Sequence, residues 1–350
     1  MRRKYAQLPA NDLRMDSMAH VGLIGCGNYG FSVIAHYLQK NYGNVIRGCM
    51  DIDVNRAASL FENFQASYYT TDAGRIIDDP KIRLVFIASN HASHAEYAIQ
   101  ALAAGKDVHI EKPHVVTDDQ LQRLCAALRA HPSRIVSIGF NRPCSPFGNQ
   151  VRESLWRDQG ELMQSWFIAG HKIDRDHWYF NKGEGGRVLG NLCHWIDMVY
   201  QIMPPDRRFP VMINPTPSAK AEANMAVSYV FGDGSIASLT FCEQDEGFEG
   251  VRERYTANRG NTFVSIDDFK RLTIDVGADK WQWSPRHRDH GHEASICRSY
   301  ETSADSGTVG CEERYVSEAG QLFLRTREAL ETSRALSVDA WPGADLLTPE

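Results

Sequence analysis

The chain has 350 residues, of which 43% are hydrophobic and 23% are charged, and its formal net charge at pH 7 is −6. This composition is typical of a globular protein of about two domains, and the acidic balance argues against nucleic acid or an anionic membrane as a partner. No apolar run is long enough to span a membrane. The basic residues at the start are not followed by the apolar segment that a signal peptide would have. We therefore expect a cytoplasmic protein that acts on a small molecule, with its eight cysteines as free thiols.

A short apolar run ends in glycines that match the pattern G-x-G-x-x-G. Gly25 would allow a tight turn, Gly27 would let the backbone approach a pyrophosphate, and Gly30 would let a helix pack closely on the strand. The helix that follows would direct its first N–H groups at the phosphates. We therefore predict cofactor contacts by these glycines and by Asn28 and Tyr29 between them.

Residues 19–140 alternate between strand and helix patterns after this turn. The expected helices are 28–40, 54–64, 72–78, 95–104 and 117–130, and the expected strands are 45–50, 83–88, 106–110 and 134–139. This alternation predicts a Rossmann-type, doubly wound parallel sheet. Asp51 follows the second strand about 20 residues after the glycines, where such folds place a carboxylate on the ribose hydroxyls. Because a carboxylate there repels a 2′-phosphate, NAD is favoured over NADP. Asp53 is the better candidate for capping the next helix.

Polar residues follow two further strands at the edge where cofactors bind. Ser89, Asn90, His91 and His94 come after one of them, and we predict that they contact the cofactor. Glu111-Lys112-Pro113 follows the next strand. A lysine there would project toward the nicotinamide, where its charge could stabilise alkoxide character in a substrate. Glu111 and Lys112 are therefore also predicted cofactor contacts.

A different pattern fills residues 141–350. The expected helices are 145–157, 188–203 and 312–335, and the expected strands are 161–169, 221–231, 236–241, 251–257 and 261–274. Residues 281–306 are expected to form loops. Adjacent strands joined by tight turns predict a second, α+β domain with an antiparallel sheet. Residues 1–18 are polar and aperiodic, and we expect a frayed extension.

Two histidine-bearing segments remain as candidates for chemistry. A glycine-rich stretch, 183–190, leads into a helix on which Asn191, His194 and Asp197 share one side. Of these, His194 is suited to carry a proton near neutral pH, although a histidine bonded inside the domain is equally compatible with the pattern. The tract 286–292 holds three histidines without the spacing of a zinc site, so we expect a solvated loop and no metal.

These motifs, taken in order over about residues 20–275, resemble the Gfo/Idh/MocA oxidoreductases, named for glucose-fructose oxidoreductase, inositol dehydrogenase and rhizopine catabolism. The resemblance rests on the glycine turn and on the segments 51–53, 87–94, 111–113, 139–142 and 185–197. It implies a Rossmann domain joined to an open-faced antiparallel sheet, and a homo-oligomer such as a dimer or tetramer. It also implies hydride transfer between NAD(P) and a ring hydroxyl of a sugar, sugar nucleotide or cyclitol, with Lys112 and His194 as catalytic residues. Arg142, Trp178 and Asn191 are then predicted to contact the substrate.

The chain departs from the pattern of this family at three positions. Gly190 stands where many relatives have aspartate, Asn191 where one subgroup has glutamate, and His91 where asparagine is common. Because asparagine cannot take a proton, the work of a missing carboxylate would pass to Lys112, to His194, or to Asp174 or Asp176.

Three functions are compatible with this sequence. The leading hypothesis is an NAD-dependent sugar or cyclitol dehydrogenase. The second is a glycosidase that uses tightly held NAD for transient oxidation and elimination. The third is a non-catalytic NAD-binding sensor or assembly protein, which the absence of carboxylates at Gly190 and Asn191 motivates.

Overall fold

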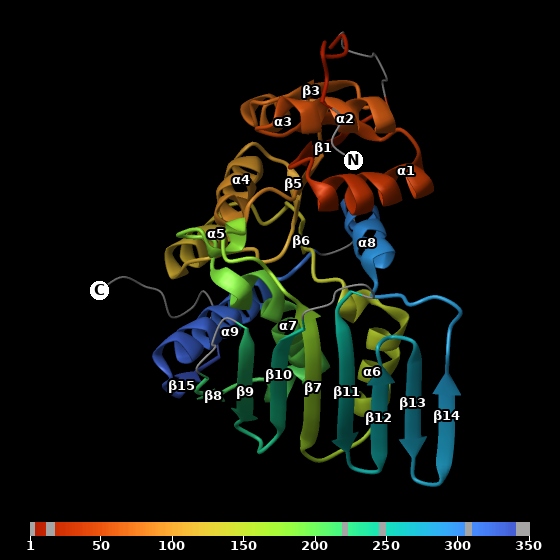
Figure 1. Ribbon diagram of the computed structural model, residues 1–350, viewed down its shortest axis with the longest axis vertical. Coiled ribbons are helices and arrows are strands. Elements are labelled where there is room, and N and C mark those ends of the chain that lie inside the picture. Colours follow the sequence, from red (N-terminus) through yellow and green to blue (C-terminus); the bar gives the residue numbers. More distant parts are fainter. Residues whose placement is uncertain (1–3, 12–17, 219–222, 245–249, 305–309, 341–350) are drawn as a thin grey trace. The chain divides into compact units, whose positions relative to one another are not determined.

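The described residues form two compact units. The computed structural model describes residues 4–11, 18–218, 223–244, 250–304 and 310–340. The first unit consists of residues 1–139 and 292–316, and the second of residues 140–291 and 317–350. We predicted from the sequence that residues 292–316 belong to the second domain, but in the structure they are part of the first unit. The physical reason is helix α8 (His292–Ala304), which packs on α1 (His36–Tyr42) (Figure 1). Lys40 forms an ion pair with Glu293 (2.8 Å), and the rings of Tyr42 and Tyr300 are stacked.

The first unit contains a six-stranded parallel sheet with the strand order β3-β2-β1-β4-β5-β6. Its strands are β1 (Val21–Ile24), β2 (Ile46–Met50), β3 (Tyr68–Thr70), β4 (Leu84–Ile87), β5 (Asp107–Ile110) and β6 (Val136–Ile138). The predicted doubly wound sheet is confirmed. The sequence reading missed β3, which has only three residues and therefore shows no periodicity.

Helices connect these strands. They are η1 (Gly30–Ala35, a π-helix), α1, α2 (Val54–Phe64), α3 (Gly74–Ile77), α4 (His91–Ala103) and α5 (Asp118–Ala130). Asp53 caps α2 by accepting a hydrogen bond from the Asn55 N–H, as predicted. Helix α4 begins four residues earlier than predicted, so His91 and His94 lie in its first turn rather than in the preceding loop.

The prediction of a frayed extension is wrong for residues 5–11. The Tyr5 hydroxyl donates to Glu62 (2.6 Å), and Asn11 exchanges two hydrogen bonds with the Tyr69 backbone (2.8 and 3.1 Å). These partners come from α2 and β3, which the segment covers. Residues 1–3 and 12–17 of the predicted extension lie outside the described residues, as do 221 and 222 of the predicted strand 221–231 and 305 and 306 of the predicted loop.

The second unit contains a nine-stranded sheet with the order β14-β13-β12-β11-β7-β10-β9-β8-β15 (Figure 1). Its strands are β7 (Leu162–His171), β8 (Val211–Thr216), β9 (Asn224–Phe231), β10 (Ile236–Gln244), β11 (Arg252–Arg259), β12 (Thr262–Asp267), β13 (Arg271–Val276), β14 (Asp279–Trp283) and β15 (Leu336–Val338). The predicted antiparallel sheet is confirmed except that β7 and β10 pair in parallel.

Three predictions for this unit are wrong in detail. The single strand expected over 261–274 is two strands, because Asp268 and Phe269 adopt positive φ angles of 53° and 52° and turn the chain. The loop expected over 281–306 contains the end of β14 and all of α8. Strands β8 and β15 were not predicted.

Helices pack on one face of this sheet. They are η2 (Arg142–Cys144), α6 (Pro146–Trp156), η3 (Trp178–Phe180), η4 (Val188–Leu192, a π-helix), α7 (Cys193–Ile202), η5 (Pro205–Arg207) and α9 (Glu313–Thr332). Side chains of β11 alternate between exposed and buried, and the rings of Trp166 and Tyr255 lie 4.5 Å apart in the core. Within the described ranges, no helix has both the length and the apolar character needed to cross a membrane.

Candidate functional site

The carboxyl ends of four neighbouring strands of the first unit lie level with one another. Cross-strand pairing aligns their last residues, which are Ile24, Met50, Ile87 and Ile110. Gly25 and Asp51 follow two of these ends directly, and Lys112 follows a third by two residues. The strand order reverses direction between β1 and β4, and open α/β sheets bind ligands at that switch point. The predicted site residues therefore share one edge of the sheet.

The three glycines of the turn have three different surroundings. Gly25 has a φ of 99°, and a Cβ there would collide with the Ala88 carbonyl oxygen. A Cβ on Gly30 would collide with the Gly25 carbonyl oxygen, so the helix start packs closely against the turn. A Cβ on Gly27 would have no atom within 4 Å. Open space over Gly27 is the space that a phosphate group needs in order to approach the backbone.

Asp51 is fixed beside this turn. Its Oδ2 accepts a hydrogen bond from the Cys26 N–H and its Oδ1 accepts one from the Asp53 N–H, both at 2.9 Å. The residue is buried. A carboxylate held by two backbone N–H groups next to an open glycine turn fits the ribose and pyrophosphate of a dinucleotide.

His91 and His94, for which we predict cofactor contacts, are both buried in the first turn of α4. The His94 ring contacts two backbone oxygens, with Nδ1 2.9 Å from that of Pro113 and Nε2 3.1 Å from that of Ser89. Burial lowers the pKa of His94. This histidine joins the segments that follow β4 and β5. Ser89 Oγ lies 2.7 Å from Ser93 Oγ, and Asn90 is exposed at the start of α4.

Glu111 and Lys112 differ in exposure. Glu111 is buried, with Oε1 3.1 Å from His109 Nε2 and Oε2 accepting from the Lys112 N–H at 3.3 Å. Both carboxylate oxygens of Glu111 therefore have protein partners, and its cofactor contact stays a prediction. Lys112 is half-buried, and the peptide bond between Lys112 and Pro113 is cis.

The second unit carries the predicted histidine. The π-helix η4 runs into α7, and His194 lies in the first turn of α7 with its ring 6.1 Å from Phe140 and 6.0 Å from Trp195. His194 and Asn191 are both half-buried, whereas Asp197 is buried. Part of each of the first two side chains is exposed, whereas His194 Nδ1 and Asn191 Oδ1 are themselves buried.

Gly190 has a packing reason for lacking a side chain. A Cβ there would lie 2.5 Å from Cε2 and 3.1 Å from Cζ of Tyr179. Tyr179 therefore occupies the space beside η4 in which a side chain at position 190 would stand. Its neighbour Trp178 is partly exposed, and the two rings meet edge to face at 4.6 Å. The sequence marks Tyr179 as an aromatic that could stack on a sugar or pack in the core, but its contact with Gly190 is not encoded locally.

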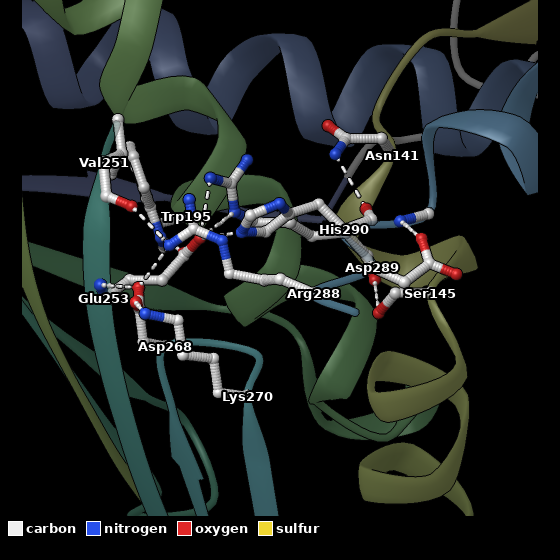
Figure 2. Close-up of polar contacts among 12 residues, drawn as sticks. Asn141, Ser145, Trp195, Val251, Glu253, Asp268, Lys270, Arg288, Asp289 and His290 are labelled. Atoms are coloured by element: carbon white, nitrogen blue, oxygen red, sulfur yellow. Dashed lines mark hydrogen bonds and ion pairs between the residues drawn. The ribbon is translucent and has the colours of Figure 1, made fainter. Parts of the chain in front are cut away.

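Arg142, for which we predict a substrate contact, is paired within the second unit. Arg142 is buried, and its Nε donates to Glu253 Oε2 at 2.9 Å. Its guanidinium also lies 4.4 Å from the centre of the Trp195 ring, and the Trp195 Nε1–H donates to the same carboxylate at 2.5 Å. Figure 2 shows Trp195 and Glu253 in this cluster. Arg142 thus connects η2 to β11 and α7, and its charge is committed to a protein partner.

The histidine tract is a loop as far as Gly291, as predicted, with Arg286, His287 and Asp289 exposed, but Arg288 and His290 are partly buried and paired within the protein. His290 Nε2 lies 3.2 Å from Glu253 Oε1, and the Asn141 side chain donates to the His290 carbonyl at 2.7 Å (Figure 2). Arg288 pairs with Asp268 at 2.9 Å. Burial opposes the charge on Glu253, but Arg142 and His290 outweigh it and lower the pKa of Glu253 to about 2. Among the described residues, no group of three or more His, Cys, Asp or Glu could hold a metal ion.

The sequence reading missed Glu253 although a signal for it exists. Every second side chain of β11 is buried, and these buried residues are Glu253, Tyr255, Ala257 and Arg259. A carboxylate at an inward position of an amphipathic strand requires a buried partner. The sequence could therefore have shown that Glu253 is paired, but not that Arg142 is the partner.

Comparison with known proteins extends this picture. The family model described as "Oxidoreductase family, NAD-binding Rossmann fold" matches residues 19–140. Inositol 2-dehydrogenase of Ralstonia nicotianae is 36% identical over 125 residues, which are 35% of this chain and 37% of that protein. The uncharacterized oxidoreductase YrbE of Bacillus subtilis is 22% identical over 334 residues, 91% of this chain and 96% of that protein. The chain thus matches little more than a third of the Ralstonia enzyme.

Solved structures share the whole fold. A levoglucosan dehydrogenase in complex with NADH and levoglucosan has a TM-score of 0.78 at 17% identity and covers 91% of this chain and 99% of its own. A putative myo-inositol dehydrogenase from Sinorhizobium meliloti has a TM-score of 0.74 at 18% identity, with the same coverage. Together with the strand order, the glycine turn and Asp51, the family match shows that residues 19–140 form an NAD-binding Rossmann domain of the Gfo/Idh/MocA oxidoreductase type. The solved structures show that the fold of the chain is shared with these dehydrogenases.

Proposed function

We propose that the protein is an NAD-dependent dehydrogenase or reductase that acts on a secondary ring hydroxyl or ketone of a sugar, sugar nucleotide or cyclitol. The observation that carries this proposal is the alignment of the carboxyl ends of β1, β2, β4 and β5. It brings Gly25, Asp51 and Lys112 to one edge of the sheet. The names of the relatives, inositol 2-dehydrogenase and levoglucosan dehydrogenase, support the substrate class.

The cofactor residues follow from the turn. The backbone from Gly25 to Gly30, with Asn28 and Tyr29, would hold the pyrophosphate, and Asp51 would hold the ribose hydroxyls. NAD, when bound, accepts a hydride from the substrate or returns one. The negative charge of Asp51 disfavours a 2′-phosphate at the same place, which supports NAD over NADP.

Gly27→Ala should separate cofactor binding from folding. Since a Cβ at Gly27 meets no protein atom within 4 Å, the unfolding midpoint should stay unchanged, whereas NAD affinity should fall at least about tenfold because the methyl group occupies the approach to the backbone. Isothermal titration calorimetry with NAD measures the affinity. Undiminished NAD affinity in Gly27→Ala would contradict the proposed phosphate site.

Lys112 and His194 divide the proton chemistry in this proposal. The Lys112 ammonium would donate a hydrogen bond to the substrate oxygen and stabilise its alkoxide character, while His194 in its neutral form would accept the hydroxyl proton. Asn191 would bind a neighbouring hydroxyl without taking a proton. The partly exposed indole of Trp178 offers an apolar face to a sugar ring.

A second copy of the chain is also part of the proposal. Adjacent strands of the second sheet carry an exposed apolar row, which runs across Met212, Val230, Ile236 and Met163. Cross-strand pairing places these side chains next to one another on the sheet face. An exposed apolar row of this kind is typical of a surface that is covered by a partner, which supports a homo-oligomer.

The test is a substrate panel. Purified protein with NAD and a set of sugars and cyclitols should accumulate NADH, seen by its absorbance, and His194→Ala should lower that rate by at least about 10²-fold. His287→Ala removes an exposed imidazole from the same unit and serves as the control. Release of an aglycone from a glycoside without net NADH would show the glycosidase instead. NAD binding without turnover across the panel would show the sensor and refute the proposal.

A further inference from the structure

A loop of the second unit has its two ends joined by one buried arginine. The loop, residues 172–186, follows β7 and leads to Arg187, the residue that precedes η4. Arg187 Nη2 donates to the carbonyl of His171 at the other end of the loop, 16 residues away in the sequence. Its Nη1 donates to Glu243 Oε1 at 3.2 Å, and the same oxygen accepts from the Ile173 N–H at 2.9 Å. One guanidinium and one carboxylate of β10 therefore hold both ends of the loop.

The guanidinium of Arg187 is itself fixed by packing. It lies 4.9 Å from the centre of the Phe241 ring on β10. That ring covers Gly170 of β7, where a Cβ would lie 2.2 Å from Phe241 Cζ. A planar guanidinium stacked on a ring directs the N–H groups at its edge toward acceptors in its own plane. A lysine ammonium is a compact point charge and cannot reproduce this arrangement.

The loop carries a cluster of three aromatic rings. The ring of Tyr179 lies 4.6 Å from that of His177 and 4.6 Å from that of Trp178, edge to face in both cases. Tyr179 also packs on Gly190 of η4, where a Cβ would lie 2.5 Å from Cε2. Since η4 continues into α7, Gly190 and His194 belong to one uninterrupted helical run. The loop is therefore packed against the helix that bears the proposed proton acceptor, and Trp178 in it is partly exposed.

We propose that Arg187 and Glu243 are positioning residues that hold the loop 172–186 in the conformation that binds the sugar or cyclitol, so that this loop determines the affinity for the substrate. The inference rests on the proposed function, in which Trp178 contacts the substrate. Arg187 is 1% exposed and Glu243 is bound to it, so both residues act through the loop and not on the substrate itself.

The physical argument concerns the conformational freedom of the loop. A loop whose ends are joined has fewer conformations than one that is held only by the chain. Without the joint, the loop would occupy its binding conformation for a smaller fraction of the time, and the apparent substrate affinity would fall by that fraction. Lys112 and His194 would still be present, so saturating substrate would restore turnover. We therefore expect a higher KM with little change in kcat.

The first measurement follows the loop itself in the full-length protein without substrate. Arg175 and Lys182 are exposed in the loop, and trypsin cleaves after residues of both types. Because cleavage of a folded chain requires local opening, its rate reports how often the loop opens. Arg187→Lys and Glu243→Ala should each raise the rate of cleavage after Arg175 and Lys182 about tenfold. Mass spectrometry of the peptides released at short digestion times measures this rate.

The second measurement is steady-state kinetics with the sugar or cyclitol of the panel that wild type turns over fastest. Arg187→Lys and Glu243→Ala should each raise KM for it about tenfold, with kcat within about threefold of wild type. Glu243→Gln should bring KM back to within about threefold of wild type, because its amide oxygen can still accept from Ile173 and Arg187. A variant that is only less stable would have less active enzyme and a lower apparent kcat, but an unchanged KM.

The opposite ends of the same two strands provide the matched control. Arg207 Nη1 donates to the carbonyl of Gly160, just before β7, at 3.2 Å and to Asp233 Oδ2, just before β10, at 3.3 Å. Arg207→Lys thus changes an arginine that also joins a carbonyl to a carboxylate, but at the other end of β7. Its loop cleavage and its KM should equal those of wild type. If Arg187→Lys does not fold, as judged by circular dichroism, Glu243→Ala at a partly exposed position carries the test.

Two results would overturn the inference. One is a wild-type KM in folded Arg187→Lys or Glu243→Ala, whether or not the loop is cleaved faster, and the other is an equal rise of KM in Arg207→Lys. Failure of the proposed function gives a different result: wild type turns over no sugar or cyclitol of the panel, while the loop is still cleaved faster in the two variants. The two failures are therefore distinguishable.

Discussion

Replacing Lys112 with methionine is expected to lower kcat by about 10³-fold while NAD affinity stays within about threefold of wild type. Methionine keeps the length of the apolar stem and removes only the ammonium group. Removal of a preorganised cation from a developing alkoxide raises the barrier to hydride loss, whereas the glycine turn and Asp51 hold the dinucleotide without it. Steady-state kinetics of NADH formation and calorimetric NAD titration measure the two quantities separately.

Two variants make this result interpretable. Lys81→Met alters an exposed lysine in the same unit and should leave kcat unchanged. Lys112→Arg keeps the positive charge but changes its shape and its distance from the backbone, and it should recover only part of the activity. A Lys112→Met enzyme that keeps more than a tenth of wild-type kcat would remove Lys112 from the chemistry.

The first unit could be predicted from its sequence because of how its strands are buried. β4 and β5 are buried along their whole lengths, so β4 reads as a continuous apolar run, and each is followed by polar residues and a helix. The spacing of Gly25, Gly27 and Gly30 marked the turn, and Asp51 follows these glycines at the sequence distance that such folds require. These local signals determined the fold class and the edge of the cofactor site.

The segment 281–306 could not be predicted, for two physical reasons. β14 is a five-residue edge strand with every side chain exposed, so no buried face marks it and its alternation is limited to Trp281-Gln282-Trp283. α8 directs serines at four-residue spacing, Ser295, Ser299 and Ser303, toward the interior. Hydrophobic periodicity does not detect a helix whose buried face is polar.

The partners of the buried polar residues were equally beyond the sequence. Arg142 and Glu253 are separated by 111 residues, and His109 and Ser299 by 190. A sequence can show that a buried charge needs a partner, but only the folded chain selects which one. For that reason, residue type alone suggested ligand contacts for Arg142, His94 and Glu111, whose polar groups are engaged within the protein.

The largest effect on stability is expected at Glu253. Glu253→Gln should lower the free energy of unfolding at pH 7 by about 3–5 kcal/mol, because it leaves the buried guanidinium of Arg142 without a counter-charge. Urea unfolding followed by tryptophan fluorescence measures this loss. Asp267→Asn, which affects the exposed pair of Asp267 with Arg254, is the control and should leave the unfolding midpoint unchanged. A Glu253→Gln midpoint equal to wild type would show that the cluster contributes nothing to stability.

The pH dependence of the same variant tests the charge of Glu253. Its pKa of about 2 in the folded protein lies below the ordinary value of a glutamate, so this group stabilises the fold above about pH 4.5 and loses that contribution as pH falls toward 2. Between pH 6 and pH 3, wild type should therefore lose about 2 kcal/mol that Glu253→Gln does not lose. The double variant Arg142→Met with Glu253→Leu should be more stable than Glu253→Gln, because it removes both buried charges together. If the double variant were the less stable of the two, hydrogen bonds to Trp195 and His290 rather than the ion pair would account for the stability of the cluster.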